Sequence, residues 1–181
     1  MPRGYVKVFQ YGSNMNPGRL NSVERLDGKA KTVGVARLDG WGVRFDLYSE
    51  SNGCGVTDII VAPDEFVLGV LYEVPTPYVV ARSGGRSRMD RIEGAKSDGS
   101  GNYEKQCLNV IIGDDTVKAI TYIGTSLGRK RFAAKSTQRK QVSHEYFQNL
   151  EQGAKFFGLP ELYTSYLKEK AGIPQAVSQG E

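Results

Sequence analysis

The hydrophobic pattern of the chain changes after residue 123. Before that point, short runs rich in β-branched and aromatic residues alternate with turn-forming residues, which is typical of strands. These runs cover residues 5–11, 33–38, 41–47, 55–61, 66–74, 103–112 and 116–123. From Ser143 onward, apolar residues recur at helical spacing instead. The order predicts an α+β fold, a compact mixed β-barrel or sheet of about six or seven strands with flanking helices and a C-terminal helical pair.

Turn signals place the ends of several elements. Gly113-Asp114-Asp115 predicts a hairpin between the last two strands, and Pro63-Asp64-Glu65 predicts a similar turn. Gly84-Gly85 would weaken a helix that ran through it, so we place a helix over residues 86–92 only.

Two helices are predicted near the C-terminus. Ser143 can cap the first, and Gly158 ends it. Pro160 can open the second. The expected inward-facing residues are Phe147, Leu150, Ala154 and Phe157 in the first helix, and Tyr163, Tyr166 and Leu167 in the second.

The length of 181 residues is that of one domain, which we expect over 1–171, followed by a polar, frayed tail over 172–181. No apolar run approaches the roughly 18 residues of a membrane span. The N-terminus lacks the regions of a signal peptide. We therefore expect a cytoplasmic protein that makes no membrane contact and is a monomer or homodimer.

The net charge is too small to argue for nucleic acid as a partner, and we do not expect one. The 24 basic and 20 acidic residues leave a net charge of only +4. Basic residues do concentrate in one stretch, which either binds polyanions or keeps a loop solvated. They are Arg129, Lys130, Arg131, Lys135, Arg139 and Lys140.

The sequence lacks the residues that several kinds of catalytic and binding site require. The single histidine, His144, falls in a predicted first helical turn, which argues against a Ser/His/Asp relay and against a catalytic zinc site. Cys54 and Cys107 are too isolated for a zinc site or a disulfide framework. Neither glycine-rich nucleotide-binding motif is present. The sequence therefore predicts no metal site and no cofactor.

Two segments point to carboxylate chemistry combined with anion recognition. A turn, Tyr11-Gly12-Ser13-Asn14-Met15-Asn16, follows the first strand, and such turns offer free backbone N–H groups to anions. Glu93 lies between Ile92 and Gly94 at a helix end, where apolar surroundings would raise its pKa. Glu93 is thus the candidate proton-transfer group.

In these segments the chain resembles the γ-glutamylcyclotransferase superfamily. The resemblance spans roughly residues 5–167 and rests on Tyr11-Gly12-Ser13-Asn14, Ile92-Glu93-Gly94-Ala95-Lys96, and Ser143-His144-Glu145-Tyr146 followed by Gly158-Leu159-Pro160. Residues 97–102 form a longer link than is usual after the glutamate.

The resemblance implies the roles of the site residues. Tyr11, Gly12, Ser13, Asn14 and Met15 would cradle the α-carboxylate end of a γ-glutamyl group. Glu93 would be the general acid/base. Further tyrosines would face the same cavity, namely Tyr103, Tyr122 and Tyr146.

The implied reaction is release of 5-oxoproline from a γ-glutamyl peptide or amide, by attack of the α-amine on its own γ-carbonyl without metal or cofactor. The substrate would be a small γ-glutamyl molecule whose leaving amine stays open. The basic stretch before Tyr146 could gate the cavity or contact an acidic leaving group. The alternative is a noncatalytic module on the same fold that binds a small carboxylate or a polyanion.

Overall fold

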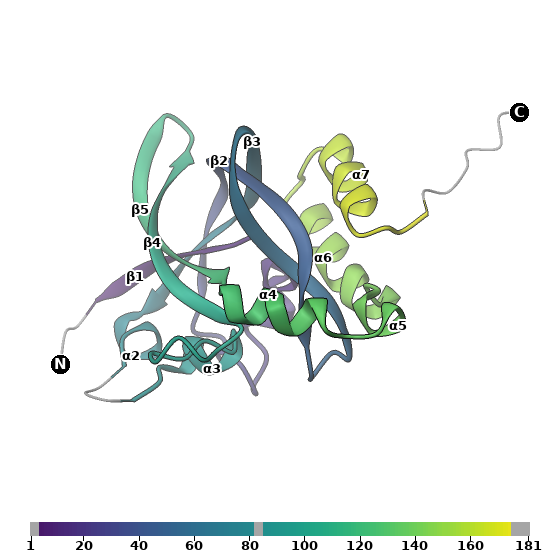
Figure 1. Ribbon diagram of the computed structural model, residues 1–181. Coiled ribbons are helices and arrows are strands. Elements are labelled where there is room, and N and C mark those ends of the chain that lie inside the picture. The colour runs from purple at the N-terminus through teal and green to yellow at the C-terminus, as the bar shows by residue number, and fades with distance from the viewer. Residues whose placement is uncertain (1–3, 82–84, 175–181) are drawn as a thin grey trace, which may run out of the picture.

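A computed structural model describes residues 4–81 and 85–174 of the chain (Figure 1). Five strands close into a ring in the order β1-β3-β2-β4-β5. All neighbouring pairs are antiparallel except β1 and β5, which are parallel. The strands are β1 (Tyr5–Gln10), β2 (Lys31–Ser49), β3 (Cys54–Pro75), β4 (Tyr103–Ile112) and β5 (Asp115–Gly124).

Two of these strands are long, and each contains two of the predicted runs. The predicted turn at Pro63-Asp64-Glu65 is wrong, because β3 continues through it. The pairing shifts there from Trp41 opposite Val61 to Asp39 opposite Phe66, so β3 carries extra residues in a bulge. Proline is tolerated in a bulge because its missing N–H breaks no ladder bond. The seven runs are therefore five strands.

The hairpin between β4 and β5 is confirmed. Ile112 pairs with Asp115 across the turn, and Gly113 takes a φ of +57°, which glycine adopts without steric cost.

Short helices fill the connections and longer ones follow the strands. Before β4 these are η1 (Ser13–Met15), α1 (Pro17–Leu20), α2 (Thr76–Val79) and α3 (Arg88–Ile92). After β5 come α4 (Ser126–Ala133), α5 (Thr137–Lys140), α6 (His144–Phe156) and α7 (Glu161–Lys170). The prediction of a helix over 86–92 is confirmed by α3, although Gly84 lies outside the described residues.

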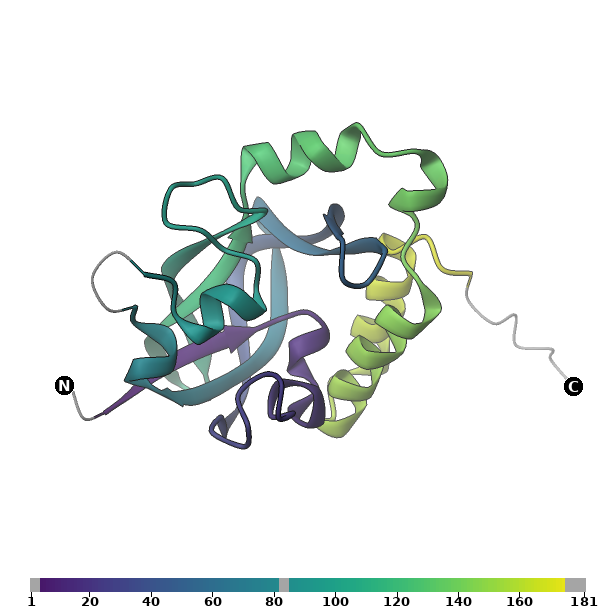
Figure 2. The ribbon, with the colours of Figure 1, turned by 90° about the horizontal axis from the view of Figure 1, so that it is seen from below.

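The predicted C-terminal helical pair is α6 and α7. The Ser143 hydroxyl accepts the Tyr146 N–H and caps α6, and Gly158, with a φ of +65°, follows its end. Both helices bury their apolar side against the strands, where Leu150 and Leu167 are fully buried in the main core. Figure 2 shows α6 beside η1. At this contact a Cβ on Gly153 would lie 2.6 Å from the Asn16 nitrogen, so glycine permits the close approach.

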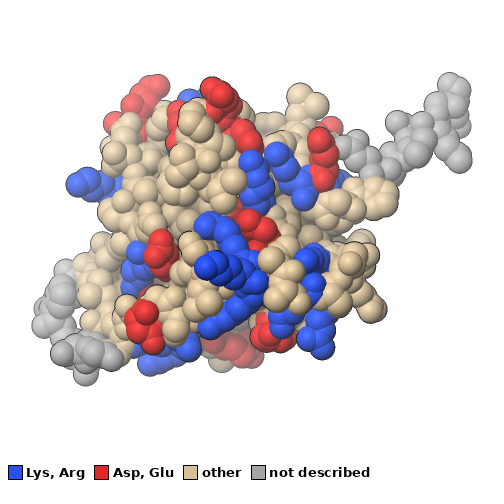
Figure 3. All heavy atoms as spheres, in the orientation of Figure 1, with Lys and Arg blue, Asp and Glu red and all other residues tan. Residues whose placement is uncertain are grey.

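The basic stretch is helical, in α4 and α5, rather than a loop. Lys and Arg side chains gather on the face that α4 crosses (Figure 3). Several of them are held by the protein: Arg129 by Asp58, Arg131 by the Ser100 carbonyl and Lys135 by Glu50.

Among the helices of the described residues, none is long and apolar enough to cross a membrane. Of the tail expected over 172–181, residues 175–181 lie outside the described part of the chain.

Candidate active site

A cavity of about 200 Å³ opens between the turn after β1, the end of α3 and the inner surface of the ring. It brings together segments that are far apart in the sequence. All but one of the predicted site residues line it: Tyr11, Gly12, Ser13, Asn14, Glu93, Tyr103, Tyr122 and Tyr146.

Met15 is the exception. Its side chain is fully buried in the main core, and its carbonyl accepts a hydrogen bond from the Tyr72 hydroxyl at 2.8 Å. The reason is the helical path of η1, which turns Met15 away from the cavity that Ser13 and Asn14 line. Met15 therefore supports the turn from below and is not part of the cavity wall.

The turn requires glycine at position 12. A Cβ on Gly12 would collide with the Thr57 hydroxyl on β3. Gly12 also leaves the start of η1 without a side-chain cap, and the first N–H groups of a helix have no partner within it. Ser13 and Asn14 carry these N–H groups and line the cavity, where an anion can accept hydrogen bonds from them.

Glu93 follows α3 directly and serves as its C-cap. A reciprocal capping box between Ser87 and Asp90 sets the start of this short helix and thereby the position of its end. Glu93 Oε1 accepts a hydrogen bond of 2.9 Å from the Asn14 amide, which joins the glutamate to the turn. Desolvation by burial raises the pKa of Glu93, and the bond from Asn14 and the charge of Arg25 limit the rise. The raised pKa suits a group that must both take and return a proton near neutrality.

A chain of hydrogen bonds fixes the orientation of Asn14. Arg25 donates to Asn14 Oδ1 at 2.8 Å, so the Asn14 NH₂ group must point the other way, to Glu93. Arg25 is a site residue that the sequence reasoning missed. It lies nine positions after Asn16, the end of the turn, and this closeness in sequence to the predicted cradle was the available signal.

The four cavity tyrosines have protein partners for their hydroxyls. Tyr103 donates to the Thr57 carbonyl, and Tyr146 lies 3.1 Å from the Thr57 nitrogen and 2.8 Å from its hydroxyl. Tyr11 donates to the Tyr122 carbonyl, and the Tyr122 hydroxyl donates to Asp90 at 2.9 Å. Burial raises the pKa of each of these phenols. They are therefore neutral, fixed walls of the cavity.

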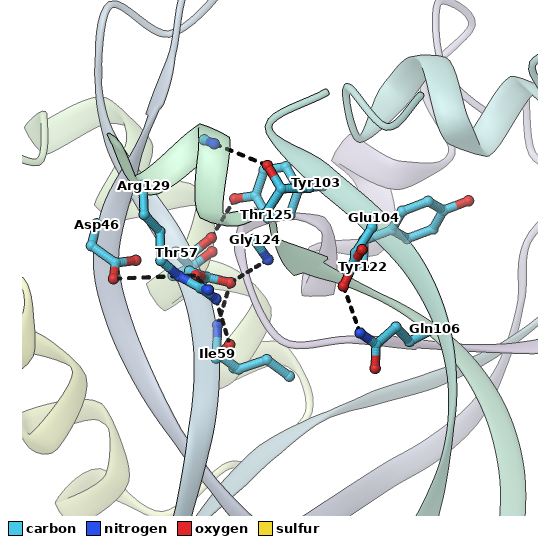
Figure 4. Close-up of polar contacts among 12 residues, drawn as sticks. Asp46, Thr57, Ile59, Tyr103, Glu104, Gln106, Tyr122, Gly124, Thr125 and Arg129 are labelled. Atoms are coloured by element: carbon cyan, nitrogen blue, oxygen red, sulfur yellow. Dashed lines mark hydrogen bonds and ion pairs between the residues drawn. The ribbon is translucent and has the colours of Figure 1, made fainter. Parts of the chain in front are cut away.

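Thr57 and its neighbour Asp58 were also missed. The Asp58 side chain is fully buried and lies 2.6 Å from the Arg129 guanidinium, while its Oδ1 accepts the Gly124 N–H at 2.6 Å. Figure 4 shows Arg129 reaching from α4 toward Asp46 and the Ile59 carbonyl, with Thr57 and Tyr103 alongside. Burial raises the pKa of Asp58 to about 6, although Gly124 and Arg129 oppose the rise. This ion pair holds the part of β3 that anchors Tyr103 and Tyr146.

Two other predictions concern residues near the site. His144 is exposed at the first position of α6 and does not line the cavity, in line with a surface role. The basic stretch in α4 and α5 contributes no side chain to the cavity lining in the described part of the chain. Across residues 4–81 and 85–174, no cluster of three or more His, Cys, Asp or Glu has the spacing of a metal site.

Comparison with known proteins is consistent with this geometry. The family model described as gamma-glutamyl cyclotransferase, AIG2-like, matches residues 8–148. No curated protein is significantly similar to the chain in sequence.

Solved structures share the fold. A gamma-glutamyl cyclotransferase superposes with a TM-score of 0.70 at 22% identity, over 98% of this chain and 92% of its own. An uncharacterised human protein gives a TM-score of 0.72 at 21% identity, over 98% and 93%. A yeast gamma-glutamyl cyclotransferase specific to glutathione gives 0.53 at 14% identity, over 93% and 98%. At these identities the likeness shows the fold.

Proposed function

Because the chain belongs to the gamma-glutamyl cyclotransferase, AIG2-like family, we propose that it is an enzyme that releases 5-oxoproline from a γ-glutamyl peptide or amide. Glu93 is the general acid/base of this proposal. Tyr11, Gly12, Ser13 and Asn14 bind the γ-glutamyl group, and Tyr103, Tyr122 and Tyr146 shape the cavity around it.

The reaction needs one proton acceptor and later one proton donor. The α-amine of the substrate is mostly protonated near pH 7, because its ordinary pKa is about 8. The Glu93 carboxylate takes that proton, and the freed nitrogen attacks the γ-carbonyl carbon. A lactam C–N bond forms, the C–N bond to the leaving amine breaks, and Glu93 returns the first proton to the departing nitrogen. The attacking nitrogen loses its second proton as the lactam forms, and the released amine takes it up and departs as an ammonium ion. Holding the substrate folded supplies the proximity on which this cyclisation depends.

One observation carries the proposal: Glu93 and the turn residues Ser13 and Asn14 line the same cavity, and the Asn14 side chain is hydrogen-bonded to Glu93. The turn suits the α-carboxylate of a γ-glutamyl group. In this proposal the neighbouring α-amine faces Glu93, and the raised pKa of Glu93 supports its role in proton transfer.

The test is release of 5-oxoproline, followed by mass spectrometry, from a panel of γ-glutamyl amino acids, peptides and amines. Glu93→Gln removes the carboxylate at constant length. Glu104→Gln is the matched control, because Glu104 is exposed on β4 and outside the cavity. Release by the wild type and by the control, but not by Glu93→Gln, is the expected result.

A different outcome would favour the alternative function. If the wild type bound a γ-glutamyl compound in calorimetry but released no 5-oxoproline from any panel member, the cavity would be that of a noncatalytic carboxylate-binding module. The proposed activity would then be wrong.

A further inference from the structure

Two partly buried arginines in the cavity wall have no acidic partner. Arg19 and Arg25 both line the cavity, and neither forms an ion pair within residues 4–81 and 85–174. Burial lowers the pKa of Arg25, and the charge of Arg19 lowers it further, so the two cations are close enough to repel each other. Two like charges withdrawn from water in one wall favour an anion between or beside them.

Arg19 has unused hydrogen-bonding capacity. Its Nε is buried and has no hydrogen-bond partner in the described part of the chain. Its Nη2 donates a long bond of 3.3 Å to Asn52 Oδ1, in the turn between β2 and β3. Asn52 is itself fixed, because its amide donates to the Ser49 hydroxyl at 2.7 Å. A guanidinium offers five N–H donors in a planar fork that matches a carboxylate, and Arg19 uses few of them.

The two arginines are hydrogen-bonded to different parts of the cavity lining. Arg25 is joined through Asn14 to Glu93. Arg25 therefore lies at the reacting end, with the α-amine and α-carboxylate of the substrate. Arg19 is joined instead to the β2–β3 turn. The β2–β3 turn lines a part of the cavity of its own, and a leaving amine that extended toward this turn would reach Arg19.

We propose that Arg19, positioned by Asn52, determines specificity by binding a carboxylate on the leaving amine, so that the enzyme prefers γ-glutamyl amino acids and peptides to γ-glutamyl amines that lack this carboxylate. The inference rests on the proposed function. It assigns the contact with an acidic leaving group to α1, and not to the basic stretch in α4 and α5, whose residues do not line the cavity.

The test uses two substrates that differ only in this carboxylate, γ-glutamyl-alanine and γ-glutamyl-ethylamine. The wild type is expected to turn over the first with the higher kcat/KM. In Arg19→Gln, kcat/KM for γ-glutamyl-alanine should fall about tenfold to a hundredfold, which is the usual worth of a hydrogen bond to a charged group. The value for γ-glutamyl-ethylamine should change little. Arg19→Lys should retain part of the preference, because it keeps the charge but loses the fork.

The ratio of the two kcat/KM values in one preparation does not depend on how much of a variant is folded. Arg139→Gln is the matched control, since Arg139 is exposed on α5 and lies outside the cavity. It should leave the ratio unchanged.

Equal losses on both substrates would overturn the inference, because Arg19 would then bind the α-carboxylate or only support the fold. A wild type that treats both substrates alike would also overturn it, while leaving the proposed function intact. A wild type that releases 5-oxoproline from neither these substrates nor the wider panel would reject the function and the inference together.

Discussion

Two carboxylates lie beside the same cavity, and their surroundings differ. Glu93 lines the cavity and accepts its hydrogen bond from a neutral amide, that of Asn14. Asp58 is fully buried, forms an ion pair with Arg129 and accepts the Gly124 N–H. Burial raises the pKa of both carboxyls, and the charges of both raise the pKa of Tyr11.

The difference shows that a raised pKa alone does not identify the reactive group. Proton transfer requires that a substrate atom reach the carboxylate. Glu93 meets that requirement at the cavity wall. Asp58 is enclosed, and its oxygens are occupied by Arg129 and by backbone N–H groups, so it stabilises β3 beneath Thr57. This difference is why we propose proton transfer for Glu93 and support of the cavity wall for Asp58.

The largest expected effect is the loss of activity on changing Glu93, which would distinguish its role from that of Asp58. Glu93→Gln should lower the rate of 5-oxoproline release by about a hundredfold to ten-thousandfold, the usual contribution of a general acid/base. Its free energy of unfolding near neutral pH should stay the same or rise, because burying a charged carboxylate is unfavourable. Parallel assays and urea titrations measure both quantities. If the variant were both inactive and strongly destabilised, Glu93 would have a structural role like the one proposed for Asp58.

Loss of the ion pair between Asp58 and Arg129 should lower the free energy of unfolding, in contrast to the result expected for Glu93→Gln. Arg129→Gln leaves Asp58 buried without its cation, which costs about 3–5 kcal/mol of unfolding free energy. Urea titration measures this cost. The control is Arg37→Gln, in the exposed pair with Asp39 whose side chains are each 50% exposed, where about 1 kcal/mol or less is expected.

The pH dependence of this cost follows from the pKa of Asp58. Its value is raised from 3.8 to about 6, so the folded state holds the proton more tightly and the contribution of this carboxyl to stability falls as pH rises through that range. Arg129 lowers this pKa, so removing Arg129 raises the pKa of Asp58 further and enlarges the loss of stability as pH rises. Arg129→Gln should therefore be more destabilising at about pH 7.5 than at about pH 5. Equal destabilisation at both would contradict the ion-pair role.

A further prediction concerns the contact between Gly12, in the turn, and Thr57, which precedes Asp58 on β3. Gly12→Ala would push a methyl group against the Thr57 hydroxyl, beside the residue that carries the ion pair. Overpacking of this kind costs about 1–3 kcal/mol and should displace the turn, so that KM rises. Gly4→Ala is the control, because its Cβ would lie 3.7 Å from the nearest atom, the Thr76 hydroxyl oxygen. Normal kinetics in Gly12→Ala would show that the turn does not need this close approach.

The smallest effect is a shift in pH dependence. Because the pKa of Glu93 is raised above 4.5, kcat/KM should increase with pH through an acid limb that lies above that value. Arg25 lowers this pKa, so Arg25→Gln should move the limb to still higher pH. Arg139→Gln should leave the limb in place. A limb that moved to lower pH in Arg25→Gln would contradict the proximity of Arg25 to Glu93.

Local sequence was sufficient to pick out two segments that the structure brings together at one cavity. The turn at Tyr11–Asn14 and Glu93 were found because each combines a turn or helix end with unusual side chains within a few residues. The same reasoning failed at Pro63–Glu65, where proline lies in a bulge of a continuous strand, and at Met15, where η1 turns the side chain into the core. In both cases pairing or packing with distant residues decided the outcome.

Two of the residues that the sequence left unnoticed, Thr57 and Asp58, have partners far along the chain. Thr57 meets Tyr146 across 89 positions, and Asp58 meets Arg129 across 71. The α+β order and the C-terminal helical pair follow from short-range periodicity and capping, which each segment expresses alone. Closure of the ring, the different environments of the two carboxylates and the Arg19 Nε, which has no hydrogen-bond partner among the described residues, were decided only by the tertiary structure, because burial and charge pairing depend on the whole set of neighbours.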